Sequence, residues 1–324
     1  MEFRKDPVTQ NWVIQEDGEF SWAEGPCPLC PGQESLNPLT LYEHANGAGW
    51  EVRVTPHPRP VYRVEGEAER RGEGLYDKMR NVGAHEVVVE HPDHSLTLSR
   101  QSDEHVAQVI RACVARMTDL KKDRRFRYVS VFRNQGPLAG QDLEHPHTQI
   151  TALPFIPRSV VYELRSAQRY FSLKERCLFC DIAQQELAQK LRTVDWNDRW
   201  IAFCPFASRG PYETWIIPLA HSATFEESVT AWETQLHLGK FLAGILRRVE
   251  TVTANYHLVL HTSPNLNAKF ERAGHWRSIR EDFHWHFEIL PVFPQRAKSY
   301  SIREVLYNSV RPETAAERLR YATA

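Results

Sequence analysis

EVVVEHPDHS at residues 86–95 and ETWIIPLAHS at residues 213–222 are two versions of one sequence pattern. Each copy begins with a glutamate, continues through an apolar centre suited to a buried strand, and places a His-Ser pair at the same offset. A C-x-x-C pair precedes each copy, at Cys27/Cys30 and at Cys177/Cys180. The chain therefore contains one structural unit twice.

The segments around the two copies follow one order. Before each copy, an extended segment ends at a proline (residues 50–56 and 199–205). After each copy comes an amphipathic helix, which in the first unit begins after the N-cap Ser102 and in the second covers residues 229–249. A strand follows each helix (residues 128–132 and 256–260), and each unit closes on an H-x-H strand.

This order predicts an α+β fold of two tandem repeats, each an antiparallel sheet with a packed helix and a zinc site. We expect an N-terminal repeat at residues 1–165 and a C-terminal repeat at residues 166–324. The charged segments 65–74 and 121–125 are predicted to be solvated surface.

Cysteine and histidine spacing predicts two metal sites. Each repeat holds one C-x-x-C pair, one His-Ser histidine and one H-x-H histidine, which is the tetrahedral Cys₂His₂ set that structural zinc prefers. The predicted ligands are Cys27, Cys30, His94 and His145 for the first site and Cys177, Cys180, His221 and His284 for the second.

Other readings of these residues stay open. The cysteine pairs could be redox dithiols or inert core residues. Near the second H-x-H strand, Glu163, His261 and His286 offer a rival ligand set, although it would leave the cysteine pair unexplained. Iron is an alternative to zinc at the second site.

Charge and composition exclude several kinds of partner. The 324 residues carry 40 basic and 41 acidic side chains, so no overall field attracts the chain to nucleic acid or to an anionic membrane. No stretch has the length and apolarity of a signal peptide or a membrane span. We expect a cytoplasmic protein, where paired cysteines favour metal binding over disulfides.

The H-P-H-x-Q strand of the first repeat carries the candidate chemistry. Alternate side chains of a strand share a face, so His145, His147 and Gln149 are predicted to point the same way. With His145 held by zinc, His147 could attack phosphorus as a neutral imidazole, and Gln149 could donate to a phosphoryl oxygen. The preceding loop adds donors and flexible backbone at Asn134, Gln135, Gly136 and Gly140.

Taken together, these motifs resemble the galactose-1-phosphate uridylyltransferase family, within the histidine-triad superfamily. The likeness extends over nearly the whole chain, and the branch of plant ADP-glucose phosphorylases looks nearer. Its marks include Arg4-x-Asp6-Pro7-x-Thr9-x-x-Trp12-Val13, Pro92-Asp93-His94-Ser95, Phe132-x-Asn134-Gln135-Gly136, His145-Pro146-His147-x-Gln149, Trp215-Ile216-Ile217-Pro218 and His261-Thr262-Ser263-Pro264.

The resemblance implies a homodimeric nucleotidyltransferase that acts on nucleotide sugars and hexose 1-phosphates. His147 would take the nucleoside monophosphate and pass it to a sugar phosphate or to inorganic phosphate, and Lys298 and Glu304 resemble part of the sugar-binding stretch. Two alternatives remain: a phosphorylase or hydrolase of ADP-sugars or dinucleoside polyphosphates that uses the same histidine, and a zinc-stabilised binding protein without activity.

The chain also departs from the family pattern. Residues 14–20 lack the two arginines that usually meet the substrate; Arg53, Arg59 and Arg63 are candidate replacements. His57 stands where an asparagine is common, and Asp142 and Glu144 stand where small or hydroxyl residues are usual. A carboxylate about 4 Å from a phosphate costs about 4 kcal/mol at an effective dielectric constant near 20.

Overall fold

The computed structural model describes residues 1–16, 25–47, 49–268, 276–294 and 306–322. Within them, one ten-stranded antiparallel sheet contains strands from both repeats, in the order β10-β11-β12-β14-β13-β8-β9-β7-β4-β3. The first repeat supplies β3 (Tyr42–Ala45), β4 (Trp50–Pro56), β7 (Ala84–Val89), β8 (Tyr128–Gln135) and β9 (His147–Leu153). The second supplies β10 (Thr193–Trp196), β11 (Trp200–Phe203), β12 (Thr214–Pro218), β13 (Tyr256–His261) and β14 (His286–Pro291).

The two halves of this sheet mirror each other. Reading inward from either edge gives the same order of equivalent strands, and the halves join where β8 pairs with β13. The expected α+β fold with two tandem repeats is confirmed, and the two predicted sheets are halves of one continuous sheet. Residues 158–174, on either side of the predicted division at 165/166, form a single helix, α2 (Arg158–Lys174).

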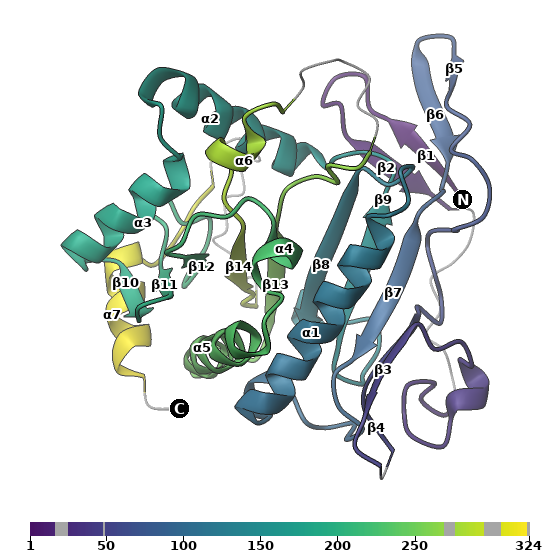
Figure 1. Cartoon of the computed structure of the whole chain (residues 1–324), viewed down its shortest axis with the longest axis horizontal. Helices are drawn as coiled ribbons and strands as arrows, with labels where there is room; N and C mark the ends of the chain where they lie inside the picture. The colour runs from purple at the N-terminus through teal and green to yellow at the C-terminus, as the bar shows by residue number, and fades with distance from the viewer. Residues whose placement is uncertain (17–24, 48, 269–275, 295–305, 323–324) are drawn as a thin grey trace.

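Two long helices pack side by side against one face of the sheet, α1 (Asp103–Leu120) and α5 (Trp232–Glu250) (Figure 1). As the sequence predicts, Ser102 caps α1, with its side chain accepting a hydrogen bond from the backbone N–H of His105. The apolar faces of both helices and of the central strands form one buried core shared by the two repeats. Burial of this shared core is the main force that holds the repeats together.

The remaining elements surround the large sheet. A four-stranded sheet, in the order β2-β1-β6-β5, comes from the N-terminal half and was not predicted. Its strands are β1 (Glu2–Lys5), β2 (Trp12–Gln15), β5 (Arg71–Glu73) and β6 (Tyr76–Arg80). The other α-helices are α3 (Leu178–Gln189), α4 (Phe225–Ser228), α6 (Ile279–Asp282) and α7 (Pro312–Tyr321), and short 3-10 helices cover Glu34–Leu36, Leu98–Arg100 and Pro137–Ala139.

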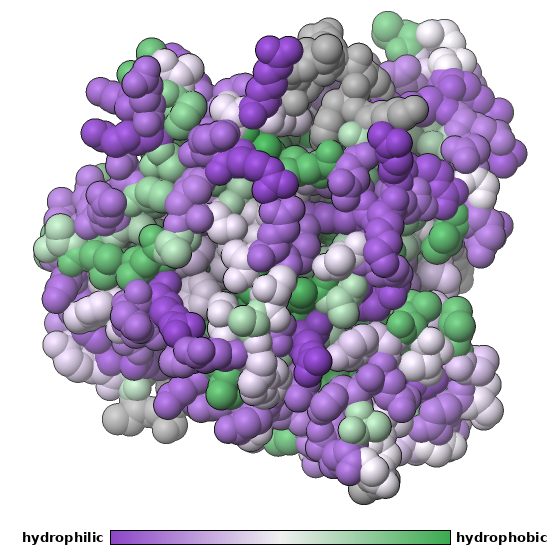
Figure 2. Space-filling model, in the orientation of Figure 1, coloured by the Kyte–Doolittle hydropathy of each residue, from purple (hydrophilic) through white to green (hydrophobic). Residues whose placement is uncertain are grey.

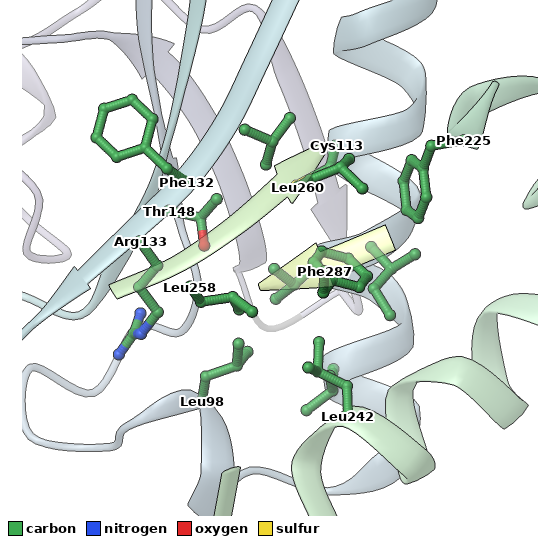
Figure 3. A pocket seen from close by; sticks show the side chains of 14 residues that line it. Leu98, Cys113, Phe132, Arg133, Thr148, Phe225, Leu242, Leu258, Leu260 and Phe287 are labelled. Carbon is green, nitrogen blue, oxygen red and sulfur yellow. The ribbon is translucent and has the colours of Figure 1, made fainter. Parts of the chain in front are cut away.

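An apolar pocket lies between the sheet and its two long helices (Figure 3). Thr148 lines this pocket, whereas its neighbours His147 and Gln149 point to the opposite face of β9. The pocket therefore lies on the other side of the sheet from the H-P-H-x-Q histidine and is a feature of the shared core.

The surface agrees only in part with the sequence prediction. Residues 65–74 are mainly exposed, as expected, but Lys121 is buried and forms an ion pair with Glu226 of the other repeat, so its prediction as solvated surface is wrong. The face drawn in Figure 2 is mostly hydrophilic, with small separate hydrophobic areas. Among the described helices, none is long and apolar enough to cross a membrane.

Candidate active site and metal clusters

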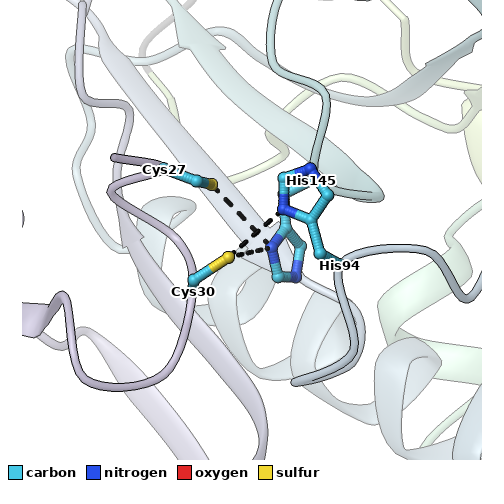
Figure 4. A group of neighbouring side chains, drawn as sticks. All are labelled: Cys27, Cys30, His94 and His145. Carbon is cyan, nitrogen blue, oxygen red and sulfur yellow. Dashed lines mark hydrogen bonds between the residues drawn. The ribbon is translucent and has the colours of Figure 1, made fainter. Parts of the chain in front are cut away.

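The four predicted ligands of the first site lie together at the loop that enters β9 (Figure 4). The ligand atoms of Cys27, Cys30, His94 and His145 all lie within 4.8 Å of one another. Sγ of Cys30 is 3.2 Å from Nδ1 of His94 and 3.5 Å from Nδ1 of His145. Nε2 of His145 donates to the carbonyl oxygen of His91 at 2.8 Å, which leaves Nδ1 with its lone pair toward the sulfurs. That is the tautomer a metal ligand needs.

The second predicted set forms an equivalent cluster. The ligand atoms of Cys177, Cys180, His221 and His284 also lie within 4.8 Å of one another. Nε2 of His221 donates to the carbonyl oxygen of Arg280, so its Nδ1 faces Cys180 at 3.3 Å. The hydrogen bond from Cys180, followed by those from His221 and His284, holds the pKa of the Cys177 thiol well below its usual range. A thiolate is the form that binds metal.

A third group of possible ligands lies beside the second cluster. Glu163, His261 and His286 bring their ligand atoms within 4.8 Å of one another, and Oε2 of Glu163 is 2.9 Å from Nδ1 of His261. From the sequence alone, this set was an alternative to the cysteine set as the metal ligands of the second half. Both sets are present because His284 contributes to the cysteine cluster and His286, two residues later, contributes to the other.

His147 begins β9 and is nearly fully buried. Its Nδ1 donates to the carbonyl oxygen of His145 at 2.8 Å, so in the neutral ring the lone pair is on Nε2. Nε2 of Gln149 lies 3.3 Å from Nε2 of His147, which agrees with the prediction that alternate side chains share one face. The reactive nitrogen therefore faces an amide donor.

A buried polar group behind β9 fixes this strand. Thr148 donates to Oε1 of Glu90 at 2.7 Å, and the other oxygen of Glu90 forms an ion pair with Arg133. Arg133 also donates to the carbonyl oxygen of His147 at 3.2 Å. Sequence reasoning missed this group, although a charged residue at the end of each apolar strand, in EVVVE and YVSVFR, was a signal for it.

In front of His147 lies a hydrogen-bonded network that includes two departures from the family pattern. Oδ2 of Asp142 is 2.8 Å from Nε2 of His57, and Oδ1 of Asp142 is 3.0 Å from Nε2 of Gln149 and 3.3 Å from Nε2 of His147. Nε2 of His85 lies 2.9 Å from Oε1 of Gln149. Burial, and to a smaller extent the neighbouring imidazole of His57, lowers the pKa of His85 to about 4, so His85 is neutral and donates.

The predicted substrate-binding residues fall into three groups. Oδ1 of Asn134 is 2.9 Å from Nδ1 of His257 of the second repeat, and the side chain of Gln135 accepts from Arg133. Gly136 and Gly140 both have positive φ, and a Cβ at Gly136 would meet Asn255 at 2.3 Å. Lys298 and Glu304 lie outside the described residues.

Of the three candidate replacement arginines, the structure rules out one. Arg53 is buried and donates to Oγ1 of Thr40 and to the carbonyl oxygen of Asn37, so its prediction as a substrate clamp is wrong. Arg59 lies at the site, where it donates to the carbonyl oxygen of Asp142 at 3.0 Å. Arg63 is exposed.

Comparisons with known proteins bear on this arrangement. Residues 5–157 match the model of the galactose-1-phosphate uridyl transferase N-terminal domain. A solved uridylyltransferase structure superposes with a TM-score of 0.81 at 28% identity, covering 99% of this chain and 97% of that chain. Residues 5–157 are thus similar to the N-terminal domain of galactose-1-phosphate uridylyltransferases, and the fold of such an enzyme extends over nearly the whole chain.

Two characterised relatives show how far the family likeness extends. A galactose-1-phosphate uridylyltransferase from Thermotoga maritima is 28% identical over 99% of this chain and 98% of its own length. ADP-glucose phosphorylase from Arabidopsis thaliana is 28% identical over 98% of this chain and 92% of its own length. Its structure with bound ADP-glucose has a TM-score of 0.78 at 26% identity, covering 100% of this chain and 99% of that chain. The family includes enzymes with different nucleotides, and the chain is an enzyme of the nucleotidyltransferase kind.

Proposed function

We propose that this enzyme transfers a nucleotidyl group from a nucleotide sugar to a hexose 1-phosphate through a covalent intermediate on His147. One observation carries the proposal: the hydrogen bond from Nδ1 of His147 to the carbonyl oxygen of His145, which directs the lone pair of Nε2 into the site. A neutral imidazole with one nitrogen fixed in this way is an activated nucleophile.

The proposed reaction has two balanced steps. In the first, the lone pair of Nε2 forms a bond to the α-phosphorus, and the bond from that phosphorus to the bridging oxygen breaks. The sugar 1-phosphate leaves with that electron pair. In the second, an oxygen of the acceptor phosphate attacks the same phosphorus, and the N–P bond returns its electrons to Nε2. No proton is lost or gained by the ring, because Nδ1–H stays on the carbonyl oxygen of His145.

The side chains around His147 have supporting roles in this proposal. Gln149 is held by His85, which donates to Oε1 and so turns the amide N–H groups toward the reacting centre. Its amide would donate to a non-bridging oxygen, where charge develops during transfer. The Glu90–Arg133 group would keep the strand from shifting as the phosphoryl group passes between oxygens.

We further propose that zinc occupies both Cys₂His₂ clusters. In each cluster, thiol and imidazole donors match the preference of zinc, and four protein ligands leave no open position for water. The first ion would anchor His145 beside the nucleophile and supply no chemistry of its own. Iron remains the alternative in the second repeat, where the carboxylate and imidazoles of Glu163, His261 and His286 suit it.

The setting of the enzyme belongs to the same proposal. We propose a homodimer working in the cytoplasm, where the reducing environment keeps the clustered cysteines free of disulfides and available to a metal. Its substrates are a nucleotide sugar and a sugar phosphate or inorganic phosphate.

Intact-protein mass spectrometry tests the proposal. The protein is incubated with UDP-sugars and ADP-sugars without acceptor, beside a His147→Ala variant. We expect a nucleotide-sized mass increase on the wild type alone, and its mass names the base. Loss of the adduct on addition of hexose 1-phosphate, but not in buffer, identifies a transferase. Loss in buffer identifies a hydrolase that works through the adduct, and no adduct from any donor, with both metals bound, points to direct hydrolysis or to a binding protein.

A further inference from the structure

The carboxylate of Asp142 occupies the space directly in front of the reactive nitrogen. Its Oδ1 is 3.3 Å from Nε2 of His147 and 3.0 Å from Nε2 of Gln149, and its Oδ2 is 2.8 Å from Nε2 of His57. A phosphoryl group attacked by His147 must bring its phosphorus and oxygens into this same space. The carboxylate and a phosphate therefore exclude each other sterically.

Two side chains around Asp142, His57 and Gln149, are hydrogen-bond donors, and other hydrogen bonds fix their orientation. Nδ1 of His57 accepts from the backbone N–H of Arg59 at 3.0 Å, so Nε2 of His57 carries the proton that points at Asp142. Oε1 of Gln149 accepts from His85, so its NH₂ group points at Asp142. The two hydrogen bonds, from His57 and Gln149, make an anion-binding site beside Nε2 of His147, and its present occupant is an anion of the protein itself.

Asp142 keeps its negative charge in this site. Burial raises the pKa of its carboxyl, but the contacts with the His147 and His57 imidazoles outweigh burial and hold that pKa well below its usual range. The charged and polar contacts that favour an anion thus favour the resident carboxylate, and its charge would repel a second anion that approached without displacing it.

We propose that Asp142 is a specificity-determining residue: its carboxylate fills the phosphate position in front of His147, so that a ligand binds there only if its other contacts offset the displacement of Asp142. Inorganic phosphate has no nucleoside or sugar with which to make such contacts. A nucleotide sugar or a sugar phosphate has both charge and additional surface. Asp142 therefore selects organic phosphates and works against inorganic phosphate as ligand and acceptor. This inference rests on the proposed function and deepens it, because it separates a transferase from a phosphorylase.

The test measures binding of inorganic phosphate to the resting protein by isothermal titration calorimetry. Asp142→Asn keeps the shape of the side chain and removes its charge. We expect this variant to bind phosphate at least tenfold more tightly than the wild type. Glu144→Gln is the matched control. It removes the same charge at a position two residues from Asp142, and the Glu144 side chain is 94% exposed. We expect Glu144→Gln to leave phosphate affinity within twofold of the wild type.

Two outcomes overturn the inference. Equal phosphate affinity in the wild type, in Asp142→Asn and in the smaller Asp142→Ser would mean that neither the charge nor the volume of the carboxylate competes for the site. An equal gain in Glu144→Gln would mean that overall charge, not position, controls binding. Asp142→Ser, a smaller uncharged side chain, repeats the test if the asparagine variant does not fold.

Acceptor use gives a second readout that separates this inference from the proposed function. With the nucleotidyl adduct formed first, Asp142→Asn should raise the rate of adduct loss to inorganic phosphate relative to loss to hexose 1-phosphate by at least tenfold. Absence of any adduct, together with tighter phosphate binding by Asp142→Asn, contradicts the proposed function and supports the anion-site inference. Normal adduct chemistry with unchanged phosphate affinity contradicts the inference alone.

Discussion

His147 and His286 occupy equivalent positions in the two repeats but have opposite surroundings. His147 faces the amide of Gln149 and a network of hydrogen-bond donors. His286 is enclosed by stacked rings: the centroid of Trp215 lies at 4.8 Å, that of His261 at 5.0 Å and that of Phe179 at 5.1 Å. Duplication thus preserved the H-x-H strand in both halves, with an amide donor beside the first histidine and packed rings around the second.

The residue two places after each histidine accounts for much of this difference. Glu288 replaces Gln149, and its carboxylate forms an ion pair with Arg209 at 2.6 Å and approaches Nε2 of His261 at 3.4 Å. Glu163 adds a second carboxylate to the same place. A phosphate in the second repeat would meet two carboxylates and a wall of rings, so the H-x-H motif alone does not define a nucleotidyl-transfer site.

The contrast between the two repeats would be wrong if His286 could replace His147 as the nucleophile. We expect His147→Ala to abolish the nucleotidyl adduct and to lower turnover by on the order of 10³-fold or more, because the nucleophile is removed. His286→Ala should retain the adduct at more than about half the wild-type rate per folded molecule, since His286 has no open space beside it. Quenched-flow kinetics with mass detection compares the two variants.

Normalisation by near-ultraviolet circular dichroism corrects for unfolded protein, which matters because both histidines are buried. An adduct on His147→Ala, or its loss in well-folded His286→Ala, would show that the two halves share the chemistry.

The two metal clusters have the same donors, so removing one ligand from each tests whether only the first cluster supports His147. Cys27→Ser and Cys177→Ser should each reduce bound metal from two ions to one and destabilise the protein by several kcal/mol, because the binding energy of a structural zinc contributes to folding. Cys27→Ser should in addition slow adduct formation about 10- to 100-fold, as it loosens His145, whose carbonyl oxygen holds His147. Elemental analysis and adduct kinetics supply the measurements.

Cys177→Ser is the control for general destabilisation. Its adduct rate should stay within about twofold of the wild type when both variants are compared below their unfolding temperatures. Equal slowing by the two substitutions would indicate that the first cluster has no special connection to His147.

Spacing and periodicity could predict much of this molecule. The paired C-x-x-C motifs located both Cys₂His₂ clusters, and three-residue and four-residue apolar spacing with Ser102 located α1. These features depend on local geometry or on a repeat, both of which are written in consecutive residues.

The rest depends on contacts between distant segments. His57 and Asp142 each looked unusual in the sequence, but their contact across 85 positions is set by the way β4 and the loop before β9 meet. Lys121 looked exposed because its partner Glu226 comes from the other repeat. The four-stranded N-terminal sheet also joins distant segments, since β1 pairs with β6.

Acid should affect the two repeats differently through His85, whose equivalent position in the second repeat is Tyr212. The pKa of His85 in the folded protein is about 4, below its value of 6.5 in the unfolded chain. The unfolded chain therefore binds the proton first, so stability is complete above pH 6.5 and falls as the pH drops toward 4. This one residue accounts for a loss of about 3 kcal/mol over that interval.

Urea unfolding of His85→Gln between pH 7 and pH 4 measures this contribution. The variant should lose about 3 kcal/mol less than the wild type, while the loss from protonated metal ligands is common to both proteins and cancels. Parallel pH profiles would mean that His85 is not buried as a neutral ring.

The smallest expected difference lies at the starts of the equivalent helices α1 and α5. Ser102 caps α1 with a hydrogen bond at 3.2 Å, whereas Ala231 occupies the same position of α5, in the same extended conformation, without a side-chain cap. Ser102→Ala should therefore cost about 1 kcal/mol, and Ala231→Ser should gain roughly 0.5–1 kcal/mol, because a serine oxygen can accept from a free backbone N–H. Urea midpoints with unchanged slopes measure both changes. A destabilised Ala231→Ser would mean that the first turn of α5 has no N–H group open to a cap, and that the two helices begin differently despite their shared place in the repeat.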